Sequence, residues 1–205
     1  MKNPKEINVL IACEESQAVC LAFRKLGFNA YSNDVIECSG GHPEFHLKMD
    51  CFEAIKLKKW DLMIGHPPCT HLAVSGACHF KHKQKVQSEA ITFFMNLYYS
   101  DIEYIAIENP VCIMSTHFRK PDQIINPYNF GTMERKRTCL WLKNLPKLKE
   151  TNNVKEPMLK LPYKEYAKIH YCSPGPERAK IRSKTYKCFA EQFALQWGEF
   201  LIATL

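Results

Sequence analysis

The sequence predicts an α/β protein built on a twisted, mostly parallel sheet with helices on both faces. Two observations support this fold class. Short apolar runs alternate with helical patterns through the first half of the 205-residue chain, which is typical of strand–helix–strand units. In addition, the expected strands are followed by polar residues, as happens where the carboxyl ends of parallel strands form the ligand-binding edge of an open sheet.

The elements of the first half follow one another in a regular order. The apolar runs that favour strands are residues 7–12, 29–32, 45–49, 61–65 and 104–107. Helical spacing of apolar side chains favours helices at 16–27, 51–57 and 88–98. Ser16 can cap the first helix and Gly27 ends it, while Pro67 and Pro68 end the fourth strand.

The second half is less regular. We expect a strand at residues 138–142 and surface loops over residues 143–171, a segment rich in Lys, Pro and Asn. Residues 184–205 predict a C-terminal helix. Its inward side chains are expected to be Phe189, Phe193, Ala194, Trp197 and Leu201.

Composition and charge limit the class of protein. Apolar residues make up 46% and charged residues 24% of the chain, which is typical of a globular domain. The polar N-terminus resembles no secretory signal, and no apolar run is long enough for a membrane span. We therefore expect a cytoplasmic protein with free thiols. The net charge of +7 suits a nucleotide or nucleic acid, although a solvated basic surface explains it equally well.

The polar residues at the strand ends carry the chemistry. They are Glu14, Asp34, Asp50, Cys69 and Glu108. A thiolate next to a carboxyl group suits attack on a pyrimidine. Sulfur adds to C6 and breaks the aromaticity, so that C5 becomes nucleophilic, while a carboxyl group at N3 draws electron density away from the ring.

Residues 65–76 (Gly-His-Pro-Pro-Cys-Thr-His-Leu-Ala-Val-Ser-Gly) resemble the catalytic loop of the cytosine-C5 DNA methyltransferases, in which Pro-Cys precedes a Ser-x-Ser-Gly-like segment. Glu108-Asn109-Pro110 is similar to the family's Glu-Asn-Val, and Glu134–Arg137 to its Arg-x-Arg element. These matches come in family order and span about residues 7 to 142. The resemblance is greatest to small phage-type members, which implies the cytoplasm of a bacterial cell or of a phage-infected host.

The resemblance implies a Rossmann-like class I methyltransferase that uses S-adenosylmethionine. Cys69 would be the nucleophile, Glu108 would engage cytosine N3, and Arg135 or Arg137 would contact the base or steady the glutamate. Pro68 and Asn109 would lie against the base. The residues expected to bind the cofactor are Cys13, Glu14, Ser16, Asp34, Val35, Asp50 and His66.

The sequence also departs from the family pattern. Ala12–Ser16 replaces the family's Phe-x-Gly-x-Gly, Thr70 stands where Gln follows Pro-Cys, and Met133 replaces the Gln before Arg-x-Arg. Most notably, only residues 142–186 lie where the family inserts a target-recognition domain. We expect one domain over residues 1–205, with a cofactor-binding and catalytic core at 1–142, a loop-rich insert at 143–183 and a C-terminal helix at 184–205.

The missing recognition domain bears on the substrate, because flipping a base out of duplex DNA requires holding the deformed duplex. The basic segment 174–185 is expected to bind the phosphate of a cytosine nucleotide or of a single strand. The side chains expected to do so are Arg178, Lys180, Arg182 and Ser183. A solvated basic loop is the structural alternative.

A free or single-stranded cytosine nucleotide is therefore the preferred substrate. One alternative is methylation of duplex DNA with a partner or as a homodimer, and a further alternative is an inactive nucleic-acid-binding homologue. The His and Cys residues of segment 66–82 suggest zinc, but their spacing fits no standard finger, so no metal is expected. Pro67-Pro68 also resembles the motif of amino-group methyltransferases, but His66 and Cys69 do not supply the Asn or Asp and the aromatic residue that this chemistry needs. Trp60, Trp141 and Trp197 lie in apolar patterns typical of core.

Overall fold

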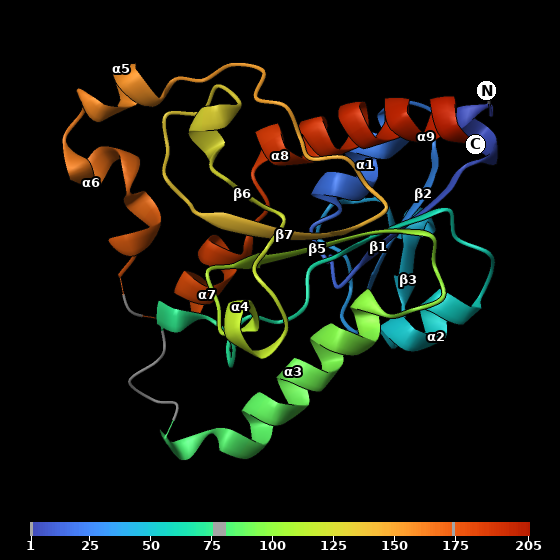
Figure 1. The fold of residues 1–205 in the computed structure, drawn as a ribbon, viewed down its shortest axis with the longest axis horizontal. Coiled ribbons are helices and arrows are strands. Elements are labelled where there is room, and N and C mark those ends of the chain that lie inside the picture. Colours follow the sequence, from blue (N-terminus) through green and yellow to red (C-terminus); the bar gives the residue numbers. More distant parts are fainter. Residues whose placement is uncertain (1, 76–80, 174) are drawn as a thin grey trace.

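The computed structural model describes residues 2–75, 81–173 and 175–205, and a seven-stranded sheet forms its centre (Figure 1). The order across the sheet is β3-β2-β1-β4-β5-β7-β6. The strands are β1 Asn8–Ala12, β2 Asn29–Asp34, β3 His46–Lys48, β4 Leu62–Gly65, β5 Tyr104–Pro110, β6 Gln123–Ile125 and β7 Thr138–Lys143. The first five strands are parallel, and β7 is antiparallel to both of its neighbours. The expected α/β, Rossmann-like class is confirmed.

Helices cover both faces of the sheet (Figure 1). One face packs against α1 (Ala18–Lys25), α8 (Lys187–Gln192) and α9 (Gly198–Thr204). The other packs against α2 (Cys51–Lys56) and α3 (Gln84–Tyr98). The strand β1 shows the consequence, because Val9 and Ile11 belong to the first apolar layer and Leu10 and Ala12 to the second. A strand covered on both faces must be apolar at every covered position, which is why residues 9–12 form an unbroken apolar run.

The strand β5 is longer than the sequence predicts. The expected strand ends at Ile107, whereas β5 continues to Pro110. Its extension pairs with β7, which the sequence also predicts, with Glu108 opposite Leu140 and Pro110 opposite Thr138. Glu108 and Asn109 are therefore fixed in a central strand and do not belong to a loop.

The C-terminal helix is interrupted, contrary to expectation, by a turn of π-helix at Phe193–Trp197. Its apolar side chains recur every four residues from Phe189 to Leu201. In a regular α-helix such a pattern drifts by about 40° at each repeat. A wider turn corrects the drift, and the expected inward residues are all buried.

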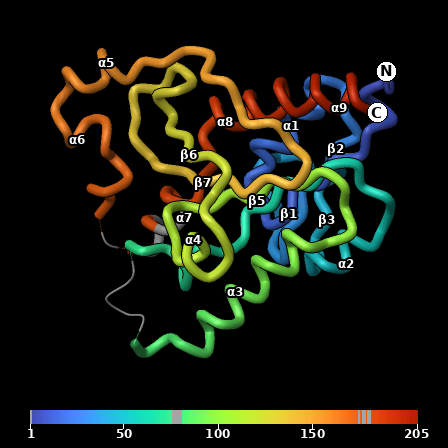
Figure 2. Tube along the Cα trace, viewed as in Figure 1, coloured from blue at the N-terminus to red at the C-terminus, as the bar shows by residue number. Residues whose placement is uncertain are grey.

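The segment 143–171, expected to be loops, contains the short helices α5 (Lys155–Leu159) and α6 (Tyr163–Tyr166). Figure 2 follows it from β7 through these helices to α7 (Pro176–Ser183). Met158, Tyr166 and Ala167 form a small apolar cluster of their own, which explains why helices form here. The sequence also missed β6 and the short helix α4 (Met114–His117).

The tryptophan interpretation is confirmed, since Trp60, Trp141 and Trp197 are at most 3% exposed. Among the described residues, no helix has the length and apolar character that crossing a membrane requires.

Candidate active site

Polar residues lie near the carboxyl ends of the five parallel strands. Asp34 and Glu108 are within β2 and β5, whereas Glu14, Asp50 and Cys69 lie beyond β1, β3 and β4. The order of the strands sets them along one edge of the sheet as Asp50, Asp34, Glu14, Cys69 and Glu108. Between β1 and β4 the winding of the sheet reverses, and open α/β sheets bind ligands at that point. The carboxyl groups of Asp50, Asp34 and Glu14 lie on one side of this point. The Cys69 thiol and the Glu108 carboxyl group lie on the other.

Asp34 and Asp50 belong to the half of the edge expected to bind the cofactor. Asp34 Oδ1 accepts hydrogen bonds from the Val35 backbone N–H at 2.7 Å and from that of Ile36 at 3.4 Å. The Val35 side chain is 66% exposed. Asp50 caps α2, and its Oδ1 accepts from Phe52 N–H at 2.8 Å. Each carboxylate uses one oxygen in these bonds, which leaves the other for hydroxyl or amino groups of a ligand.

Cys13 lies close to both of these carboxylates. Its pKa is raised, first by a hydrogen bond with Cys51, then by burial and by the negative charges of Cys51, Asp34 and Asp50. Because both carboxylates act on one thiol, the ends of β1, β2 and β3 form a single neighbourhood. This is the arrangement that an extended ligand across the three strand ends requires.

Glu14 has a structural role that the sequence assigned to Ser16. Glu14 is 4% exposed, and its two oxygens accept hydrogen bonds from Val19 N–H at 2.7 Å and Cys20 N–H at 3.2 Å, at the start of α1. Ser16 Oγ makes only a 3.5 Å contact with Ala18 N. The longer glutamate side chain reaches the free N–H groups of the first turn more closely, so it caps the helix.

The turn between β1 and α1 keeps a left-handed backbone without the family's glycines, because Cys13 and Gln17 both have φ of 60°. Such strain in residues other than glycine persists only where the surroundings impose it. Gln17 is fully buried, and it donates to Ser32 Oγ at 3.2 Å and to the His42 carbonyl at 2.8 Å. A Cβ at Gly40 would meet Gln17 Cβ at 2.6 Å. Gln17, which the sequence did not single out, therefore anchors the β2–β3 loop.

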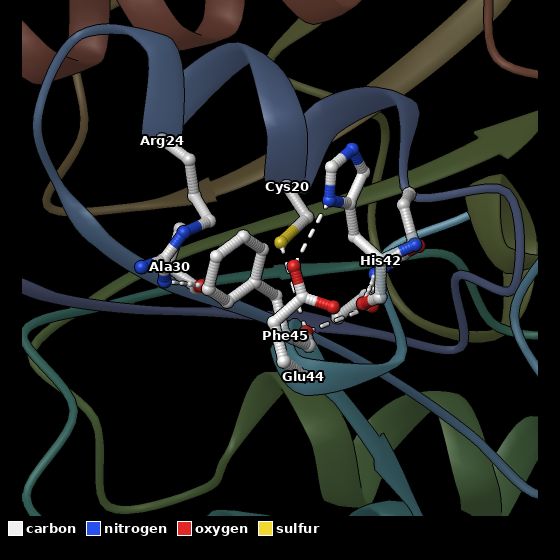
Figure 3. Close-up of polar contacts among 8 residues, drawn as sticks. Cys20, Arg24, Ala30, His42, Glu44 and Phe45 are labelled. Atoms are coloured by element: carbon white, nitrogen blue, oxygen red, sulfur yellow. Dashed lines mark hydrogen bonds and ion pairs between the residues drawn. The ribbon is translucent and has the colours of Figure 1, made fainter. Parts of the chain in front are cut away.

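Figure 3 shows how the end of this loop packs on α1. The Arg24 guanidinium lies 3.4 Å from the centre of the Phe45 ring and donates to the Ala30 carbonyl at 2.7 Å. His42 and Glu44 form an exposed pair at 3.0 Å. These contacts fix the loop that leads from Asp34 to β3.

Cys69 lies in a tight turn after β4. Its carbonyl accepts from Leu72 N–H at 3.0 Å and Ala73 N–H at 2.9 Å. Asn109, 1% exposed, donates to the Pro67 carbonyl at 2.9 Å and so ties the Pro-Pro turn to β5. Pro68 is exposed and Cys69 half-buried. Cys69 is thus held by its own turn and by the strand that carries Glu108.

Electrostatic coupling links Cys69 to Glu108. The pKa of Cys69 is raised, first by burial and then by the negative charge of Glu108, while the positive charges of Lys136 and Arg182 oppose the rise. A thiol and a carboxyl group from adjacent strand ends therefore act on each other, as the sequence predicts.

Glu108 pairs with His66, which was expected from the sequence to bind the cofactor. His66 Nδ1 lies 2.9 Å from Glu108 Oε2, and their side chains are 10% and 15% exposed. Burial alone would raise the pKa of Glu108, but the hydrogen bond and charge of His66, with the charge of Lys136, bring it below its usual value. Among the described residues, nothing hydrogen-bonds to His66 Nε2, which is buried.

Lys136 is the cation of the Arg-x-Arg-like segment that acts on the site. Exposure alternates along this extended segment, with Arg135 and Arg137 exposed and Glu134 and Lys136 half-buried. The charge of Lys136 opposes the rise in the pKa of Cys69. The same charge helps to lower the pKa of Glu108. The charge of Arg137 lowers the pKa of Cys139, which burial raises. Because side chains alternate between the two sides of an extended segment, Lys136 lies on the opposite side from its neighbours Arg135 and Arg137. This alternation could have identified Lys136 from the sequence.

The basic segment forms the helix α7, not a loop, and it approaches the catalytic turn. Arg182 donates to Ser75 Oγ at 3.5 Å and acts electrostatically on Cys69. Arg178 is half-buried, and its Nε has no hydrogen-bond partner among the described residues. Ser183 is exposed. The side chain of Lys180 lies outside the described part of the structure.

Two open surface hollows are lined by none of the five strand-end residues. One, of about 330 Å³, is lined by Phe52, Phe93 and neighbouring α3 residues, and the other, of about 310 Å³, by Arg24 and Phe28. No three His, Cys, Asp or Glu side chains gather as a metal site within residues 2–75, 81–173 and 175–205. Gly76, Cys78 and His79, which belong to the catalytic motif and the zinc alternative, lie outside those ranges.

Comparisons with known proteins find likeness to solved structures but no match to a family model or a curated protein. Among matching solved structures is an E. coli prophage protein provisionally described as a DNA modification methyltransferase, at 15% identity and a TM-score of 0.49. The match covers 77% of this chain and 56% of that one, so the chain spans little more than half of that structure's length.

Proposed function

We propose that this protein transfers a methyl group from S-adenosylmethionine to C5 of a cytosine ring, with Cys69 as nucleophile. One observation carries the proposal. Cys69 and Glu108 come from the ends of adjacent parallel strands, and the negative charge of Glu108 acts on the Cys69 thiol. Attack on a pyrimidine requires such a pair, because the thiolate and the carboxyl group must engage different atoms of one ring.

The roles follow from the contacts. Cys69 adds to C6, and Glu108 stabilises the added electron density through N3. Asn109 keeps the Pro-Pro turn in place through its bond to the Pro67 carbonyl, with Pro68 beside the base. The positive charge of Lys136 favours the thiolate of Cys69. Arg135 and Arg137 are the further candidates for the base carbonyl.

The cofactor half of the edge suits S-adenosylmethionine, which would supply an electrophilic methyl group. Asp34 would accept from ribose hydroxyls and Asp50 from the adenine amine, since each has an oxygen outside its local hydrogen bonds. The exposed Val35 side chain would flank the adenine. The strained turn from Cys13 to Gln17 would face the methionine end.

The preferred substrate within this proposal is a free or single-stranded cytosine nucleotide. Arg182 reaches the catalytic turn at Ser75, and Arg178, Lys180 and Ser183 share its helix. Guanidinium groups there would bind a phosphate while the base enters the site. The insert, whose own cluster is small, offers little surface for holding a distorted duplex.

A covalent trap tests the chemistry. With S-adenosylmethionine and 5-fluorocytosine substrates, the fluorine at C5 prevents release of the enzyme, so mass spectrometry should detect an adduct of chain and methylated base. Cys69→Ala should abolish the adduct, whereas Cys172→Ala, far from the strand ends in sequence and half-buried, should retain it. Absence of an adduct on every cytosine substrate would count against the proposal.

Two alternatives are separated by methyl transfer measured side by side on dCMP, CTP, single-stranded and duplex DNA. Transfer to the duplex alone would favour a DNA methyltransferase acting as a dimer or with a partner. No binding of S-adenosylmethionine by calorimetry would favour an inactive nucleic-acid-binding protein. If nucleotides are the substrates, Arg182→Ala should remove the preference for phosphorylated forms over free cytosine.

A further inference from the structure

His66 occupies a position that links the two halves of the edge. It follows β4, and its backbone N–H donates to the Ala12 carbonyl of β1 at 2.9 Å. Its Nδ1 lies 2.9 Å from Glu108 Oε2 on β5. Both side chains are almost completely buried, at 10% and 15% exposure. The loop that carries the nucleophile therefore also presents an imidazole to the carboxyl group.

The proposed chemistry requires a proton at this place. The ring nitrogen N3 is an acceptor, so a carboxyl group assists addition at C6 only when it carries a proton to donate. The pKa of Glu108 lies below its usual value because His66 and Lys136 outweigh the effect of burial. At neutral pH the carboxyl group of the free protein is therefore ionised and has no proton to give.

The directions of the two pKa shifts favour the imidazole over the carboxyl group as the holder of a proton shared by this pair. Burial alone would lower the pKa of His66, but the hydrogen bond and charge of Glu108, together with the charge of Glu14, raise it above 6.5 against the opposing charge of Lys136. These three groups come from β5, the β1–α1 turn and the segment before β7. Their balance favours an imidazolium paired with a carboxylate.

We propose that His66 stores the proton that Glu108 delivers, so that the two side chains act as one proton-donating pair; the inference rests on the proposed cytosine chemistry. When the base is bound, imidazolium Nδ1 passes its proton to the Glu108 carboxylate, leaving a neutral imidazole and a neutral acid. The acid donates that proton to N3 as the Cys69 thiolate adds to C6. Cys69 releases its own proton to solvent before the attack, and after methyl transfer a water molecule takes the proton from C5. The thiolate then leaves C6, and the N3 proton returns to the pair of Glu108 and His66.

The second ring nitrogen supports a functional role. His66 Nε2 is buried and has no hydrogen-bond partner among the described residues. Glu14, the nearest other acid by its effect on His66, already accepts from two N–H groups of α1. A histidine kept only for structure would have both nitrogens satisfied, because an unpaired buried polar atom is costly.

Nuclear magnetic resonance of the protein without ligand tests the pair directly. The ¹⁵N signals of His66 are identified by their loss in His66→Asn or His66→Gln. We expect His66 to titrate above pH 6.5 in the wild type and below it in Glu108→Gln, because burial then dominates. The same titration in both proteins would overturn the proposal, whatever the enzyme's substrate.

The pH dependence of kcat/KM tests the function of the stored proton. In His66→Asn the amide can donate to Glu108 in place of Nδ1 but holds no proton to pass on. We expect the alkaline limb to move to lower pH by about one unit or more, a loss of roughly tenfold above it. His117→Asn, which removes an exposed histidine of α4, should follow the wild-type profile.

An unshifted limb in His66→Asn would show that His66 only positions Glu108 and would overturn the proposal. The two experiments also separate this inference from the proposed function. A protein that methylates no cytosine substrate but shows the Glu108-dependent titration keeps the proton pair and loses the cytosine chemistry.

Discussion

Polar residues lie at both edges of the sheet, but the two edges differ in how completely the polar groups are hydrogen-bonded. At the edge of the strand N-termini, Asp61 pairs with Lys2 at 2.9 Å and accepts from Asn8 N–H at 2.7 Å, while Asn29 donates to Asn8 Oδ1 at 2.8 Å. At the opposite edge, Asn33 Oδ1, His66 Nε2 and Asn109 Oδ1 are buried without a hydrogen-bond partner among the described residues.

This difference in hydrogen bonding distinguishes polar groups that stabilise the fold from polar groups that are available to a ligand. Polar groups that satisfy one another stabilise the fold and leave nothing for a ligand. Buried groups without partners cost free energy in the free protein, and they persist where a ligand supplies the missing partner. Among the described residues, three such groups lie at the C-terminal edge, while Ser100 Oγ lies in the turn before β5. The C-terminal edge is therefore the better candidate for ligand binding, and the strained backbone at Cys13 and Gln17 supports it.

The largest expected effect is on catalysis. Glu108→Gln removes the proton donor at N3 and should lower kcat by about 10² to 10⁴-fold. Asp61→Asn, the matched amide substitution at the opposite edge, should leave kcat close to that of the wild type. Steady-state methyl transfer on the best substrate measures both. Equal losses in the two variants would remove the distinction between the edges.

The next effect is on stability. Asp61→Ala leaves Asn8 N–H and the Lys2 ammonium without their partner, and it should lower the free energy of unfolding by about 1–3 kcal/mol. Urea denaturation measures the change. Glu103→Ala, at the exposed start of β5, is the control and should change it by less than about 0.5 kcal/mol. A larger loss in the control would contradict the account of the N-terminal edge.

The smallest effect concerns Asp50, which caps α2 and is also proposed to bind the cofactor. Asp50→Ala removes the cap of α2 and should cost about 1 kcal/mol, whereas Asp50→Asn keeps a capping oxygen and should cost much less. If the carboxylate binds the adenine amine, both variants should weaken S-adenosylmethionine binding by calorimetry. Unchanged affinity in Asp50→Asn would leave Asp50 as a helix cap only.

Some of the site was predictable from local pattern alone. Each strand and the polar residue after it are adjacent in sequence, so Asp34, Asp50, Cys69 and Glu108 could be placed without knowing the sheet order. The inward residues of the C-terminal segment were equally clear, because burial of Phe193 and Trp197 follows from apolar spacing.

Other features depend on contacts between distant residues. Gln17 anchors a loop twenty-five residues away through His42, and Lys136 reaches the site because its extended segment turns one side inward. The cap of α1 is supplied by Glu14, since its side chain spans the turn that Ser16 occupies. The cluster of Met158 and Tyr166 requires contact between two separate short helices, α5 and α6.

The amino-acid sequence by itself determined the α/β class, the apolar layers and the polar residues near the strand ends, because these depend on periodicity and on neighbouring residues. Only the tertiary structure decided which groups act together. His66 and Glu108 are forty-two residues apart, and their pairing exists because β4 and β5 are neighbours in the sheet. Burial then strengthens the interaction and sets where the proton lies, which no local pattern encodes.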